Sequence, residues 1–117
     1  MQGDLAGCAA LAREGLAAAR VQGLPLMVAG FVNELAIIAS NQGDLQQGLV
    51  LTEEALANTR AIGDRRNEAG TLLNLGVCWE QGGRLASAWA TFLEAAALAA
   101  RTGSPEREQL ARSRALA

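Results

Sequence analysis

The chain has 117 residues, half of them hydrophobic, and at this size we expect one domain that buries about two thirds of its unfolded surface. Ala and Leu dominate, all ten basic residues are Arg, and His and Tyr are absent; this favours an all-helical fold and leaves no histidine for acid–base catalysis or metal binding. The net charge of −2, with acids and bases interleaved, excludes a strongly basic surface for nucleic acid or anionic membranes, and we expect neither enzymatic activity nor a cofactor.

Glycine and N-cap residues divide the chain into six predicted helices. Apolar side chains recur at steps of three and four between these signals, as in amphipathic helices. Asp44 is followed by Gln47 at the spacing of a capping box, and Ser104-Pro105 is a strong helix start. Asp4 and Asp64 are predicted N-caps of the same kind. The predicted helices cover residues 4–22, 25–41, 44–62, 64–81, 84–102 and 104–117.

An internal repeat of forty residues organises these helices. Gln2-Gly3-Asp4-Leu5 recurs as Gln42-Gly43-Asp44-Leu45, and Gly82-Gly83-Arg84-Leu85 occupies the same register. We therefore divide a single domain, residues 1–117, into units at about 2–41, 42–81 and 82–117. Short connections force neighbouring helices to pack antiparallel. Further matches in register are Glu14, Glu54 and Glu94; Ala17, Ala57 and Ala97; Gly23, Gly63 and Gly103; and Ala29-Gly30 with Ala69-Gly70.

The third helix pair carries the spacing of a known repeat family. Its small, aromatic and apolar positions are Leu75-Gly76, Trp79, Gly83, Leu85, Ala88, Phe92 and Ala95. This pattern resembles the tetratricopeptide repeat, in a forty-residue form similar to repeats of bacterial regulators of the maltose-regulon-activator type and of spindle-orientation adaptors. The resemblance implies a right-handed superhelix of antiparallel helix pairs whose first helices line a concave groove for a protein or peptide. Small residues, Gly76 and Ala88, are expected where the helices of one pair cross.

Partner-binding residues follow from the same resemblance. Members that bind chaperone tails use Lys, Arg and Asn in the groove, whereas this chain has Leu73 and Val77 there, so we expect an apolar peptide or helix as the partner. The alternative is that helices of the adjacent repeat cover Leu73 and Val77. The groove positions that we expect to bind the partner are Asn33, Ile37, Leu73, Val77, Glu80 and Leu110.

Three functions remain open at this point. The first is a protein-interaction scaffold within a larger bacterial signalling or transcriptional regulator, the second is a homodimerisation module, and the third, by family analogy alone, is a small-inducer sensor. The chain begins at the second helix of one unit and ends after the first helix of another, so we expect a fragment of a longer array. Its uncapped ends are expected to expose Leu5, Ala9 and Ala12 at one side and Leu110 and Leu116 at the other.

No stretch reaches the length of a membrane span and no basic leader is present, so we expect a cytoplasmic protein.

The remaining conspicuous residues are expected to have structural roles. Cys8 and Cys78 are expected to be reduced and buried, and two cysteines without His fall short of a zinc site. Trp79 and Trp89 are expected in the core, and Gly82-Gly83 in a helix-ending turn. Arg65 and Arg66 could contact an anionic partner or form a solvated face with Glu68.

Overall fold

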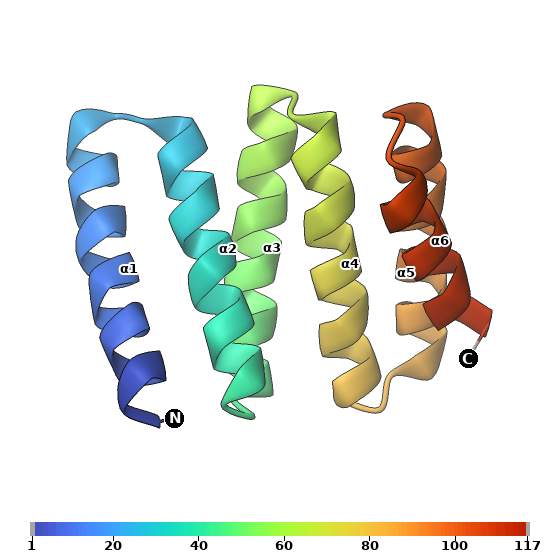
Figure 1. Cartoon of the computed structure of the whole chain (residues 1–117), viewed down its shortest axis with the longest axis horizontal. Coiled ribbons are helices and arrows are strands. Elements are labelled where there is room, and N and C mark those ends of the chain that lie inside the picture. The colour runs from blue at the N-terminus through green and yellow to red at the C-terminus, as the bar shows by residue number, and fades with distance from the viewer. Residues whose placement is uncertain (1, 117) are drawn as a thin grey trace.

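The computed structural model describes residues 2–116, with side chains from residue 7 to residue 116, and confirms an all-helical chain of six helices (Figure 1). Their bounds agree with the predicted ones to within two residues. The largest difference is at the N-terminus, where the helix already includes Asp4, so Asp4 is not an N-cap as predicted. The helices are α1 (Gln2–Gln22), α2 (Pro25–Asn41), α3 (Leu45–Ile62), α4 (Arg65–Gln81), α5 (Leu85–Arg101) and α6 (Pro105–Leu116).

All five connections between the helices have the same geometry. Each contains one glycine in the left-handed region, with φ between 66° and 82°, where a side chain would be strained. The N–H of the residue after that glycine donates to the carbonyl five residues earlier at 2.9–3.0 Å, which is the Schellman motif. The chain therefore ends one helix and starts the next, antiparallel, within two or three residues. The glycines lie twenty residues apart, at Gly23, Gly43, Gly63, Gly83 and Gly103.

Sequential helices pack side by side, and the molecule measures 38 × 30 × 20 Å (Figure 1). Besides these neighbours, α4 also contacts both α2 and α6, so the even-numbered helices form one layer. The odd-numbered helices are linked across the other layer by ion pairs in the forty-residue register. These pairs are Arg20–Glu54 at 2.6 Å, from α1 to α3, and Arg60–Glu94 at 3.2 Å, from α3 to α5.

Two apolar clusters hold the helices together. The N-terminal cluster joins α1, α2 and α3, and the C-terminal cluster joins α3 to α6. Small residues allow close approach: a Cβ added to Gly76 would lie 2.5 Å from Cε1 of Phe92, whose ring is fully buried. The buried members are Ala9, Ala12, Leu16, Val32, Leu35, Ile38 and Ala55 in the first cluster, and Leu56, Leu72, Leu73, Leu75, Ala88, Phe92, Ala95, Ala96 and Ala111 in the second.

The ends of the array differ from the prediction. Ala9 and Ala12 are buried rather than exposed, because they share with Leu16 the face of α1 that packs against α2. The predicted exposure of Leu5 lies outside the described side chains. At the other end, Leu110 and Leu116 are exposed as predicted.

The two tryptophans have different environments. Trp79 packs against the C-terminal cluster, as predicted, with the Arg84 guanidinium 5.8 Å from the ring centre. Trp89 is 54% exposed, so its predicted place in the core is wrong. It lies with Leu85 and Leu93 on one face of α5, at steps of four residues, and none of the described helices covers that face.

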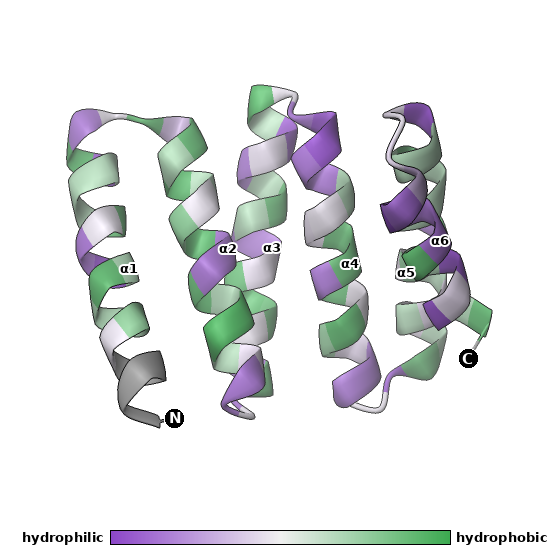
Figure 2. Cartoon of the chain, viewed as in Figure 1, coloured by the Kyte–Doolittle hydropathy of each residue, from purple (hydrophilic) through white to green (hydrophobic). Residues whose placement is uncertain are grey.

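Figure 2 shows how unevenly polarity is distributed over the even-numbered layer. Hydrophobic residues dominate α2, whereas polar residues gather at the start of α4 and along α6 (Figure 2). A surface that crosses these three helices therefore changes from apolar to charged along its length.

Candidate functional site: a groove across α2, α4 and α6

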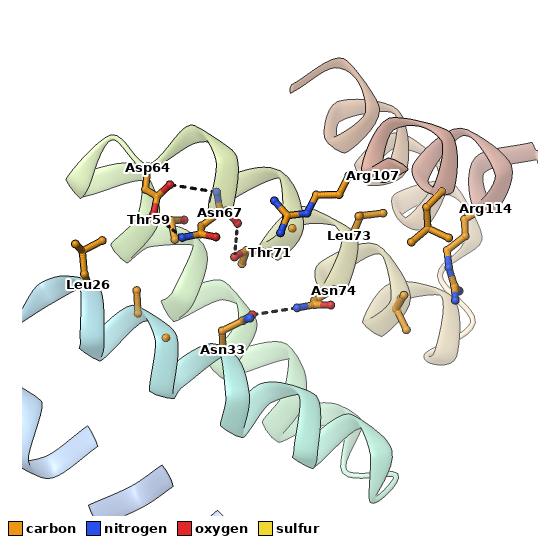
Figure 3. Close-up of a pocket in the computed structure, with 15 residues that line it drawn as sticks. Leu26, Asn33, Thr59, Asp64, Asn67, Thr71, Leu73, Asn74, Arg107 and Arg114 are labelled. Carbon is orange, nitrogen blue, oxygen red and sulfur yellow. Dashed lines mark hydrogen bonds between the residues drawn. The ribbon is translucent and has the colours of Figure 1, made fainter. Parts of the chain in front are cut away.

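A groove of about 490 Å³ crosses the layer of even-numbered helices (Figure 3). Its walls come from α2, α4 and α6, with a contribution from the end of α3 and the loop before α4. The groove therefore lies on α2, α4 and α6, of which α2 and α4 begin the predicted helix pairs α2–α3 and α4–α5. Its size falls in the range of ordinary ligand and peptide sites.

Two asparagines join the helices in the groove wall. The side-chain amide of Asn74 on α4 donates to the side-chain carbonyl of Asn33 on α2 at 3.0 Å (Figure 3). Among the described residues, neither the amide group of Asn33 nor the carbonyl oxygen of Asn74 has another protein partner. The groove lining thus contains one free donor, on Asn33, and one free acceptor, on Asn74, the two kinds of group that pair with a peptide backbone.

A second polar group occupies the end of the groove at the start of α4. Asp64 caps that helix by accepting from the backbone N–H of Asn67 at 3.2 Å, as predicted for an N-cap, and from its side-chain amide at 2.6 Å (Figure 3). Thr71 donates to the carbonyl of Asn67 at 2.9 Å. These hydrogen bonds hold the polar groups at this end of the groove together.

Arginines from α6 form the opposite wall, and the sequence analysis did not identify them. Arg107 donates to the backbone carbonyl of Arg66 at 2.7 Å and lies over Gly70, where an added Cβ would come within 3.5 Å of the guanidinium. Arg114 pairs with Glu80 on α4 at 3.2 Å. The signal was available, because both arginines share a helix face with the predicted Leu110 at steps of three and four residues.

The predicted partner-binding residues are not all equivalent in the structure. Asn33, Leu73, Val77 and Leu110 line the groove together. Ile37 lies in an adjoining depression of about 120 Å³ that it shares with Val77. Glu80 faces Arg114, as described above, and is held in that ion pair.

Leu73 and Val77 differ in accessibility. Leu73 is a buried member of the C-terminal cluster, which includes Ala111 of α6, so it serves the core as well as the groove wall. Val77 is half-buried and packs only at the edge of that cluster. The exposed apolar contacts of the groove are instead Leu26 on α2 and Leu110 on α6.

Among the described titratable groups, Glu68 at the start of α4, outside the groove lining, is the one whose pKa is clearly shifted. Burial of Glu68 disfavours its charged form, but hydrogen bonds from Arg60 at 2.9 Å and Arg65 at 2.8 Å outweigh this, so the pKa of Glu68 lies below its ordinary value. Arg65 is thereby committed to Glu68 and belongs to a solvated face. Arg66 is exposed.

The cysteines are both free, as predicted, but only Cys78 is buried. Its sulfur lies 3.4 Å from the Ser40 hydroxyl. Cys8 is exposed on α1, so the prediction of two buried thiols is wrong for this residue.

Over residues 2–116 no helix combines the length and apolarity needed to cross a membrane. The described part of the chain also has no cluster of three Cys, Asp or Glu side chains arranged to hold a metal ion. No protein-family model matches the chain, and a search of curated proteins finds none similar to it.

Proposed function

We propose that the chain is a protein-interaction module whose groove binds an extended peptide segment of a partner protein. The observation that carries this proposal is the Asn33–Asn74 pair, which leaves one donor and one acceptor free in the groove wall. A backbone N–H of a bound peptide would donate to the side-chain carbonyl of Asn74, and a backbone carbonyl would accept from the side-chain amide of Asn33. The tetratricopeptide-like register agrees with this use, and we place the module in a cytoplasmic signalling or regulatory protein.

Side chains of the bound peptide would find different surroundings on the two flanks of the asparagine pair. Leu26 and Leu110 are exposed leucines on α2 and α6, and half-buried Val77 lies between these helices on α4. Apolar side chains of the peptide would cover them, and burial of such anchors dominates the energy of peptide docking. The proposed partner segment is therefore apolar at two positions, with its backbone held between them.

Peptides selected from a random display library on the immobilised chain test this proposal. We expect the double variant Asn74→Ala/Leu110→Ser to weaken most selected peptides at least tenfold, because it removes a backbone contact and an apolar anchor. Leu85→Ser is the matched control, since Leu85 is equally an exposed leucine but lies on α5, outside the groove. Peptides that are insensitive to the groove variant, or that depend on Leu85, would refute groove binding.

Self-association is a second candidate, favoured by one specific observation. Leu85, Trp89 and Leu93 form a continuous apolar stripe on α5 that no described helix covers. Two such stripes packed against each other would bury the three side chains in an isologous contact. Because the stripe and the groove share no residue, the chain could use both.

A further inference from the structure

A second pocket lies away from the groove, where the end of α1, the start of α2 and the end of α3 meet. It is an open depression of about 490 Å³ and shares no lining residue with the groove. Its walls are largely apolar, and Arg20 and Asn58 are its polar members. The apolar side chains include Leu24, Pro25, Val28 and Ile62.

The next unit shows what normally fills this position. Forty residues on, Arg60 takes the place of Arg20, and it holds two carboxylates: its Nε donates to Glu68 at 2.9 Å and its Nη2 to Glu94 at 3.2 Å. The Glu68 side chain is nearly buried and also accepts from Arg65 at 2.8 Å. One unit on, the equivalent place therefore contains a carboxylate.

The first unit keeps the arginine but lacks this carboxylate. Arg20 Nη2 donates to Glu54 at 2.6 Å, as Arg60 does to Glu94, but Val28 stands where the next unit has Glu68. Among the side chains that the structure describes, Nε of Arg20 has no acceptor. The start of α2 is also without acidic residues, because Leu24 replaces the capping Asp64. The pocket thus keeps an unused donor on Arg20, whose charge is paired with Glu54, beside the positive N-terminal end of α2.

Asn58 adds a donor to the same pocket. Its side-chain Nδ2 is buried and has no hydrogen-bond partner, which is unusual for a buried amide. The next unit has Leu98 at this position and so has no such donor. Both donors that lack acceptors, on Arg20 and Asn58, line the pocket in which Val28 stands in place of the internal carboxylate.

We propose that this pocket binds the carboxylate of a small aliphatic acid, in the place that Glu68 occupies one unit on. Arg20 Nε and Asn58 Nδ2 would each donate to a carboxylate oxygen, giving charge-assisted hydrogen bonds. The aliphatic part of the ligand would lie over Val28, Pro25 and Ile62. A neutral amide of the same shape would lose the charge and present an N–H₂ group toward these donors.

Titration with 4-methylpentanoate, followed by ¹H–¹⁵N correlation spectra at neutral pH, tests the proposal directly. We expect saturable shifts of the Asn58 side-chain amide and of the Arg20 Nε–H, and at least tenfold weaker binding of 4-methylpentanamide. Absence of a saturable shift at Asn58, or equal binding of acid and amide, would overturn the proposal.

Two variants of pocket residues test where the ligand's carboxylate binds, and a third variant outside the pocket is the control. Val28→Glu recreates the internal carboxylate of the next unit and should weaken 4-methylpentanoate at least tenfold. Arg20→Gln removes the charged donor without entering the core and should do the same, which keeps the test valid if Val28→Glu disturbs folding. Arg101→Gln, an exposed arginine outside the pocket, should leave binding unchanged. Unaltered affinity for 4-methylpentanoate in both pocket variants would refute the assignment of the carboxylate to this pocket. None of the three substitutions changes a residue that lines the groove.

Discussion

Replacing Gly76 by Ala tests one of the close helix contacts of the fold. The added Cβ would lie 2.5 Å from Cε1 and 2.7 Å from Cδ1 of Phe92, whose ring is buried. Overpacking of this kind costs about 1–3 kcal/mol. Removing a glycine from a helix interior returns about 1 kcal/mol of helix propensity. We therefore expect a net destabilisation of about 0–2 kcal/mol.

Gly30→Ala is the matched control, because Gly30 lies inside α2 and an added Cβ would meet nothing within 4 Å. It gains the same propensity with no overpacking, so we expect it to stabilise the chain by about 0.5–1 kcal/mol. The difference between the variants isolates the contact with Phe92.

Thermal unfolding followed by circular dichroism measures this difference. For a domain of 117 residues, 1 kcal/mol corresponds to about 4 °C in Tm. Gly30→Ala should therefore raise Tm by about 2–4 °C, and Gly76→Ala should melt about 4–12 °C below Gly30→Ala. Equal stabilisation by both substitutions would refute the contact between Gly76 and the Phe92 ring.

Three further predictions concern other parts of the molecule. Glu68→Gln should destabilise the chain by about 1–3 kcal/mol at pH 7. Because the pKa of Glu68 is lower in the folded state, the stabilisation that the carboxylate provides exists above about pH 4.5 and is lost as the pH falls through the folded pKa. Urea melts of wild type and variant should therefore converge in acid, and a difference that does not change with pH would contradict the ion pairs. Without reductant, a thiol reagent should modify Cys8 in the native chain and Cys78 only after unfolding; two rapidly reacting thiols would show that Cys78 is not buried. Light scattering at high micromolar concentration should detect association that Trp89→Arg abolishes, and a strictly monomeric wild type would exclude the α5 stripe as a contact.

The sequence predicts the helices well because their boundaries depend on local chemistry. Each connection needs a residue with positive φ, and only glycine adopts that conformation without strain, so Gly63 and its equivalents are visible in the sequence. Asp44 and Asp64 cap helices by bonds that span three residues. Neither feature depends on tertiary contacts.

Side-chain environments are harder to predict, because they depend on which face of a helix meets which neighbour. The small residues Ala9 and Ala12 suit either an exposed or a closely packed face, and only the angle at which α1 meets α2 decides between them. Trp89 is a large apolar residue of the kind that fills cores, but it lies on a face of α5 that no described helix covers. The same limit applies to the groove, where Arg107 reaches α4 across a separation of 41 residues.

The spacing of the five glycine connections has a consequence for insertions and deletions. Each residue removed from a helix turns everything after it by about 100°, because an α-helix has 3.6 residues per turn. Deleting residues 42–81 would instead join Asn41 to Gly82-Gly83-Arg84, which reproduces the connection after α2 and keeps every later helix in its own layer. Deleting only twenty residues would place an odd-numbered helix in the layer of the even-numbered helices and turn its polar face inward. Changes in chain length are therefore compatible with this architecture only in steps of a whole helix pair.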